Sequence, residues 1–278
     1  MVSQRGGNAS KIFSYFKHLP FLFQNNFSIC FVLAVCAYRI LALPVVTIPN
    51  DAEQQSGNFE GDMILSKELR QALSGQRNGL TDVQYRWPNN TVHYRIIADN
   101  FTTEQVDYIR RGLDTIANAS CIRFVEADEN ATAYIRVLGQ DVGCYSEVGY
   151  LGTVQDLNLA PNTLESGCFR LGTIMHEFLH ALGFFHMQSA SDRDEYVTIV
   201  WEKIEQRFAH NFEKYNASFV SGFEVEYDYG SVLHYPAVSF SIDGNATIVP
   251  RVANVTIGQR ARLSDSDVTK LNRMYECE

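Results

Sequence analysis

The segment HEFLHALGFFH contains three of the chain's seven histidines, at positions 176, 180 and 186. His176 and His180 are four residues apart, which on an α-helix is about 400° of rotation and leaves both imidazoles on one face. Two imidazoles one turn apart can share a zinc ion at about 2.0–2.1 Å each. The spacing therefore favours a metal site over an apolar core helix that happens to include histidines.

The third histidine requires a break in that helix. On an uninterrupted helix His186 would lie about 15 Å further along the axis than His176, out of reach of a shared ion. Gly183 lies between them, and glycine readily adopts the left-handed conformation that ends many helices. We therefore expect the helix to end at Gly183 and His186 to become the third ligand. Three protein ligands leave one zinc position open, as in catalytic sites.

Glu177 is predicted to be a general base rather than a ligand, because it points about 100° away from His176 on the helix. Zinc lowers the pKa of a bound water to about 7. A carboxylate beside that water can take its proton and pass it to a leaving amine. The motif therefore predicts one zinc ion and metal-assisted hydrolysis, with protein or peptide bonds as the favoured substrates.

Length and composition fit an acidic globular protein. The chain has 278 residues, a formal net charge of −9 and a hydrophobic content of 46%. These values suit one large domain, or two small ones, with a packed core. The chain has no long run of lysine or arginine, which argues against nucleic acid as a partner.

The N-terminus resembles a targeting segment. An apolar run, FSICFVLAVCAY, covers residues 27–38 and follows several basic residues. It is short for a membrane span, which needs about 20 residues, so we expect a signal peptide over residues 1–42 and no stable membrane span. A signal anchor is the alternative interpretation, because the part before the apolar run is long.

Two further features indicate an extracellular, secreted protein. Seven glycosylation sequons follow the apolar run, and each requires a surface position: Asn89, Asn100, Asn118, Asn130, Asn216, Asn245 and Asn254. Four cysteines also follow it, Cys121, Cys144, Cys168 and Cys277. An even number in an exported domain implies two disulfides, for which the sequence alone allows three pairings.

The remaining sequence predicts an α+β domain. Alternating apolar residues indicate a strand near residues 92–96, and helical spacing indicates a helix after Thr102. We expect strands in CIRFVEA and AYIRVLG, a helix within residues 194–212, and a closing helix capped by Ser264 with Asp267 three residues later. Residues 43–77 are polar and short of aromatics, which is typical of a linker or pro-segment.

The histidine motif also identifies a family. HEFLHALGFFH matches the metzincin pattern, and the following DRDEYV resembles the astacin family of zinc metalloproteases. The resemblance covers residues 77–278 and includes RWPNNTV, GCYS, YDYGSVLHY and TIVPR. It implies a two-lobed metzincin fold with a mixed twisted sheet, an active-site helix and a mostly irregular C-terminal lobe with helices. It also implies that His176, His180 and His186 bind zinc, that Glu177 is the base, and that Tyr235 stabilises the oxyanion.

The resemblance extends to activation. FEGD, at residues 59–62, resembles the pro-segment motif whose aspartate occupies the zinc in the zymogen, so Asp62 would be the inhibitory ligand. The implied divisions are a pro-segment at 43–77 and a catalytic domain at 78–278, separated by a trypsin-like activating protease after Arg77. The implied disulfides are Cys121–Cys277 and Cys144–Cys168. A substrate strand would add to the sheet edge near residues 147–153.

Three positions depart from the family pattern. Leu233 stands where the family has a methionine beneath the zinc; leucine is close in volume, and such replacements cost less than about 1.5 kcal/mol. Met187 stands where many members have a glutamate that anchors the new N-terminus, and Ala190 where many have arginine. We expect intact zinc chemistry and an altered anchoring of the mature N-terminus.

Two further predictions concern the substrate preference and the alternative function. Arg251 follows TIVP and would favour acidic residues after the scissile bond through charge-assisted hydrogen bonds; a solvated surface arginine is the alternative. The alternative function is a catalytically weak or inactive homologue that binds proteins through its cleft. All three histidines and Glu177 are present, which favours the enzyme.

Overall fold

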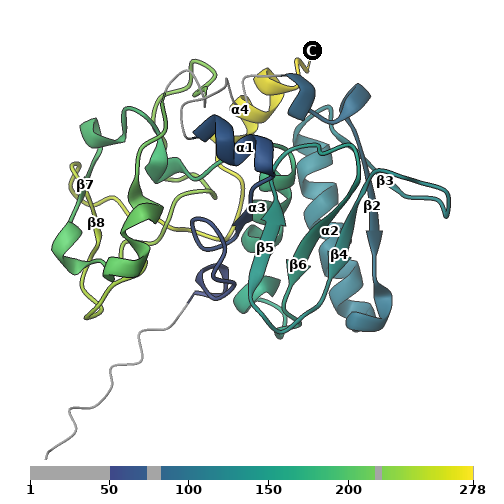
Figure 1. The fold of residues 1–278 in the computed structure, drawn as a ribbon, viewed down its shortest axis with the longest axis horizontal. Coiled ribbons are helices and arrows are strands. Elements are labelled where there is room, and N and C mark those ends of the chain that lie inside the picture. The colour runs from purple at the N-terminus through teal and green to yellow at the C-terminus, as the bar shows by residue number, and fades with distance from the viewer. Residues whose placement is uncertain (1–50, 74–82, 217–220, 278) are drawn as a thin grey trace, which may run out of the picture. The chain divides into compact units, whose positions relative to one another are not determined.

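A mixed six-stranded sheet is the framework of the N-terminal half in the computed structural model, which describes residues 51–73, 83–216 and 221–277 (Figure 1). The strand order is β1-β5-β6-β4-β2-β3, and every neighbouring pair is parallel except β5 with β6. The strands are β1 (Met63–Ile64), β2 (Thr91–Ile96), β3 (Arg123–Glu126), β4 (Tyr134–Leu138), β5 (Cys144–Glu147) and β6 (Val154–Leu159). The strands expected near residues 92–96 and in CIRFVEA and AYIRVLG are present.

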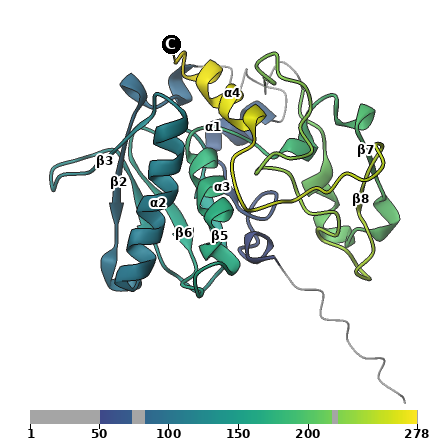
Figure 2. The same cartoon turned by 180° about the vertical axis from the view of Figure 1, so that it is seen from behind.

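Two helices cover one face of this sheet, as Figure 2 shows from behind. α2 (Thr103–Ala119) begins with a capping box between Thr102 and Gln105 and buries Ile109, Leu113 and Ile116. α3 (Leu171–Ala181) packs beside it. α3 is buried from Gly172 to Ala181, and a helix buried all round is part of the core.

The C-terminal end of α3 is fixed by its own turn and by a distant side chain. Gly183 adopts φ +102°, and the N–H groups of Gly183 and Phe184 donate to the carbonyls of His180 and Leu179. This Schellman pattern confirms the predicted break. The indole of Trp87 donates to Ala181 O, so the last turn is held from outside as well.

The C-terminal lobe is mostly irregular. A short antiparallel pair, β7 (Val197–Ile199) with β8 (Ile248–Pro250), is its only sheet among the described residues. The prediction of a helix within residues 194–212 was wrong: β7 and the 3-10 turns Trp201–Lys203 and Gln206–Phe212 occupy that segment. Pairing with β8 draws Val197–Ile199 into extended backbone. α4 (Asp265–Met274) has the predicted Ser264–Asp267 capping box, and the predicted α+β, two-lobed fold is confirmed.

Residues 51–73 fold against this domain, although their composition suggested a linker or pro-segment. β1 pairs with β5 at the edge of the sheet, and α1 (Lys67–Gln71) follows with Ser66 as its N-cap. Met63, Leu65 and Leu69 are buried in a cluster. Its other members include Tyr85, Val148, Phe185 and Tyr215. The predicted signal peptide and the bond after Arg77 lie outside the described residues.

The surface bears on the secretion hypothesis. Six of the seven sequon asparagines are exposed, where a glycan requires them to be. Asn100 is half-buried, and its side-chain oxygen accepts a hydrogen bond from Gly139 N–H. Within the described ranges, no helix has the length and apolarity needed to cross a membrane.

Two disulfides are present, Cys121–Cys277 and Cys144–Cys168, the pairs that the family resemblance implied. The first joins the segment after α2 to the segment after α4, over a sequence separation of 156 residues. The second joins β5 to the turn before α3, over 24 residues. Loop-closure entropy makes the longer bridge the more stabilising one.

We predict that replacing Cys121 and Cys277 by alanine lowers the free energy of unfolding by about 5 kcal/mol, and replacing Cys144 and Cys168 by about 3.5 kcal/mol. Urea unfolding of the two double variants and the wild type under the same zinc concentration measures the difference. A smaller loss for the first pair than for the second would contradict the loop-entropy argument.

Candidate metal centre

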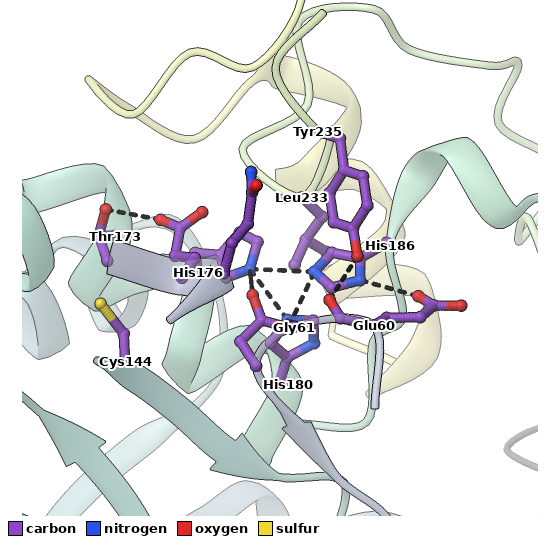
Figure 3. Close-up of polar contacts among 12 residues, drawn as sticks. Glu60, Gly61, Cys144, Thr173, His176, His180, His186, Leu233 and Tyr235 are labelled. Carbon is purple, nitrogen blue, oxygen red and sulfur yellow. Dashed lines mark hydrogen bonds and ion pairs between the residues drawn. The ribbon is translucent and has the colours of Figure 1, made fainter. Parts of the chain in front are cut away.

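Three imidazoles and one carboxylate converge at one buried place (Figure 3). His176 Nε2 lies 3.0 Å from His180 Nε2, 3.3 Å from His186 Nε2 and 3.1 Å from Asp62 Oδ2. Asp62 Oδ1 lies 3.2 Å from His186 Nε2. All four side chains are buried, and one ligand atom from each lies within 4.8 Å of every other.

The opposite nitrogen of each imidazole faces a hydrogen-bond acceptor. His176 Nδ1 lies 2.8 Å from Val232 O, and His180 Nδ1 lies 2.7 Å from Phe184 O. His186 Nδ1 lies 2.8 Å from the carboxylate of Glu60. Since these acceptors require Nδ1–H, each neutral ring directs the lone pair of Nε2 inward. Such outer partners are what fix the tautomer of metal-binding histidines.

The donor set fits a zinc ion. Three lone pairs and a carboxylate pointing at one buried place repel one another unless a cation lies among them. A tetrahedral zinc with bonds of about 2.0–2.2 Å separates neighbouring ligand atoms by about 3.3–3.5 Å, close to the separations here. Asp62 Oδ1 has no hydrogen-bond donor among the described residues, as expected for an oxygen that binds a metal.

The segment from Phe59 to Asp62 is shaped by a glycine. Gly61 adopts φ +93°, and a Cβ there would lie 2.9 Å from the carbonyl oxygen of Glu53. Only glycine fits this turn without strain. The turn directs Asp62 toward the histidines, while its carbonyl accepts a hydrogen bond from Ser146 N–H at the start of the β1–β5 pairing.

Glu60 was not singled out by sequence reasoning, yet it makes five contacts with the domain. Besides His186, its carboxylate accepts hydrogen bonds from Ser189 Oγ at 3.0 Å and from the hydroxyl of Tyr215. Its N–H donates to Asn211 Oδ1, and its carbonyl accepts from the Tyr235 hydroxyl. The only sequence signal was its place inside FEGD, which does not reveal these partners.

Glu53 and Arg260 form a second buried contact that the sequence did not reveal. Arg260 Nε lies 2.7 and 2.9 Å from the two oxygens of Glu53, and Thr173 Oγ1 donates to the same carboxylate at 2.7 Å. Burial raises the pKa of Glu53, but the charges of Arg260 and Arg170 and the hydrogen bonds from Arg260 outweigh it and lower the pKa to about 2. Glu53 and Arg260 are 207 positions apart.

Glu177 lies on α3 beside His176, fully buried, and neither of its carboxylate oxygens has a hydrogen-bond partner among the described residues. Burial raises its pKa well above the ordinary value, and the charges of Asp62 and Glu53 raise it further. A buried carboxyl without donors is well suited to bind a proton.

The other predicted residues lie at different distances from the histidines. Tyr235 is buried, with its ring centroid 4.7 Å from that of His186. Leu233 is buried, and its carbonyl accepts a hydrogen bond from Met187 N–H. Lys270 Nζ lies 3.1 Å from Met187 Sδ. Arg251 is exposed just after β8.

Comparisons with known proteins agree with this geometry. Residues 79–276 match the family model described as Astacin, a peptidase family. The chain is 36% identical to zinc metalloproteinase nas-4 of Caenorhabditis elegans over 80% of this chain and 70% of nas-4. It is 38% identical to seminal metalloprotease 1 of Drosophila melanogaster over 82% and 90%, respectively.

A solved structure agrees as well. High choriolytic enzyme 1, a hatching enzyme zinc-protease from Oryzias latipes, superposes with a TM-score of 0.63 at 37% identity. The match covers 69% of this chain and 94% of that protein. With a family model that spans most of the chain and a buried histidine and aspartate cluster that fits zinc, the chain belongs to the astacin family of zinc metalloendopeptidases.

Proposed function

We propose that this zinc endopeptidase is secreted as a zymogen and becomes active when residues 43–77 are removed. In this proposal residues 1–42 are the signal peptide, 78–278 the catalytic domain, and a trypsin-like protease cleaves after Arg77. The observation that supports the zymogen most directly is Asp62 among the three histidines. The apolar N-terminal run, the six exposed sequons and the two disulfides support secretion.

The pro-segment would inhibit in two ways. Asp62 takes the position beside the histidines where a substrate carbonyl and water would otherwise bind. β1 also pairs with β5 through residues 63–64 and 146–147, so it covers the edge expected to bind an extended peptide. Release of residues 43–77 frees both the histidine cluster and the sheet edge.

His176, His180 and His186 would hold the ion, with Asp62 as the fourth ligand in the zymogen. When bound, zinc supplies Lewis acidity, which polarises the scissile carbonyl and makes water nucleophilic near neutral pH. Glu177 would then accept the proton of the attacking water at a carboxylate oxygen and deliver it to the amine that leaves.

Tyr235 would donate a hydrogen bond to the oxygen on which charge develops. Its hydroxyl already donates to the carbonyl oxygen of Glu60 in the pro-segment, which supports an ability to reach a peptide carbonyl at this place. The ring also lies against His186 and Phe212, and this packing limits its orientation.

The alternative function is an inactive homologue that binds proteins through the cleft. It predicts that the histidines are retained for folding and that Glu177 has no role. The buried carboxyl of Glu177, which has no hydrogen-bond partner among the described residues, argues against this, because an unsatisfied buried polar group is costly and an apolar residue would cost less.

We predict that Glu177→Gln lowers the cleavage rate at least about 100-fold without loss of bound zinc, because the amide cannot accept the water's proton. The assay uses casein after removal of the pro-segment, with a chelator and with zinc content measured on each sample. Glu129→Gln, at an exposed loop position, is the matched control. Absent cleavage, or cleavage that neither the chelator nor Glu177→Gln reduces and that therefore comes from a contaminating protease, would favour the binding protein.

We predict that Glu53→Gln lowers the free energy of unfolding of the full chain at neutral pH by about 3 kcal/mol, the free energy of moving a pKa from 4.5 to about 2. Because the pKa is lower in the folded chain, the stabilisation is complete above pH about 4.5 and is lost as the pH falls toward 2. The measurement is the free energy of unfolding of the full chain from pH 6 to pH 3.

The difference between wild type and Glu53→Gln should therefore shrink as the pH falls below 4.5. Glu202→Gln, on the exposed surface of the C-terminal lobe, should show no such difference. A gap between wild type and Glu53→Gln that stays constant with pH would exclude titration of Glu53 as its source.

We propose that Arg251 favours acidic residues after the scissile bond, and we predict that Arg251→Ala removes this preference from a cleavage profile of a peptide library. The exposure of Arg251 beyond β8 leaves its guanidinium accessible. An unchanged acidic preference would reject Arg251. Arg260 would then be the next arginine to test, because it would lose the Glu53 carboxylate on activation.

A further inference from the structure

The loop from Ser231 to Tyr235 brings an acceptor to the histidine that begins the metal motif. Val232 O accepts the hydrogen bond from His176 Nδ1–H at 2.8 Å. Val232 is fully buried, so this carbonyl has no access to bulk water. The direction of that one peptide plane therefore decides how the His176 ring is held.

Asp267 fixes the peptide groups on both sides of Val232. Its Oδ2 accepts Val232 N–H at 2.8 Å, and its Oδ1 accepts Ser231 Oγ–H at 2.6 Å. Ser231 Oγ in turn accepts Leu233 N–H at 3.1 Å. Leu233 N–H belongs to the same peptide plane as Val232 O, so Asp267 reaches that plane through one hydroxyl.

Asp267 does more here than a helix cap requires. In the capping box of α4, its Oδ2 accepts Ser264 N–H at 3.0 Å and its own N–H donates to Ser264 Oγ at 2.9 Å. A capping box needs only that reciprocal pair. The remaining acceptor positions of a side chain that is 5% exposed are used on the 231–235 loop.

We propose that Asp267 is a positioning residue for the zinc ligand His176 and acts through Ser231 and Val232. The inference rests on the proposed zinc role of His176. In this proposal Asp267, in the first turn of α4, contributes to the zinc affinity of the enzyme although it lies far along the chain from the histidine motif. Loss of a group that bonds a metal-binding histidine directly typically costs about 10- to 100-fold in metal affinity. Val232 O is that group for His176, and Asp267 holds it in place.

The test compares Asp267→Asn with Ser264→Ala in the full chain. Asp267→Asn keeps the shape but leaves one acceptor oxygen for three donors. Ser264→Ala removes the N-cap oxygen of α4 and leaves the Asp267 contacts with the loop in place. The readouts are the zinc Kd from chelator competition and the visible absorption spectrum of the cobalt-substituted protein.

We expect Asp267→Asn to raise the zinc Kd about 10-fold, the lower end of the range for a direct outer partner, and to change the cobalt spectrum, while Ser264→Ala leaves both near wild type. Equal effects of the two variants, or a wild-type Kd for Asp267→Asn, would overturn the proposal. If Asp267→Asn does not fold, the Ser231→Ala variant tests the proposal instead. It removes the hydroxyl that joins Asp267 to Leu233 N–H and leaves Asp267 in the capping box of α4. A wild-type Kd and spectrum for Ser231→Ala would then reject the inference.

The variant His176→Ala distinguishes failure of the proposed Asp267 role from failure of the proposed zinc site. A large loss of zinc in His176→Ala with no loss in Asp267→Asn rejects only the role of Asp267. Retention of wild-type zinc affinity by His176→Ala would reject the proposed site itself, and the inference with it.

Discussion

Buried acceptor atoms that face one another govern this structure. The Nε2 atoms of His176, His180 and His186 and the carboxylate of Asp62 lie about one hydrogen-bond length apart with their lone pairs inward. Such a cluster is stable only around a cation. Every neighbouring element serves to keep it in place: the break at Gly183, the 231–235 loop and the turn at Gly61 each bring one group to the same point.

The three histidines differ in where their outer partners come from. His180 uses Phe184, four residues away in the turn that ends α3, whereas His176 uses Val232, 56 residues later. His186 uses Glu60, 126 residues earlier and inside the proposed pro-segment. If residues 43–77 are removed as proposed, His186 loses this outer partner together with Asp62 and needs a new acceptor. His176 and His180 would keep their partners, so the orientation of these two rings would not depend on the proposed activation.

Sequence alone predicted what lies close along the chain. The pairing of His176 with His180 and the turn at Gly183 follow from spacing within one short segment, and α2 and α4 follow from caps and apolar periodicity. The Glu53–Arg260 pair, the Glu60 contacts and the Asp267–Val232 bond join residues 35 to 207 positions apart, where no local pattern exists. The wrong helix within residues 194–212 has the same cause, because β7 forms through a partner strand far later in the chain.

Residues 53–62 of the proposed pro-segment are held beside the histidines mainly by charge, whereas residues 63–72 pack against the domain through apolar side chains. Glu53, Glu60 and Asp62 are all buried. Glu53 accepts hydrogen bonds from Arg260 and Thr173, and Glu60 accepts them from Ser189 and Tyr215. Asp62 faces the three histidines, with which it would share the ion. A slip of one residue would place a buried carboxylate against the wrong group, at a cost that apolar packing does not impose. The arrangement therefore specifies a single register for residues 53–62. In the proposed activation, release of residues 53–62 would expose hydrogen-bond donors that water or a peptide can satisfy. Release of residues 63–72 would expose the apolar side chains that pack against them, among them Val148 and Phe185.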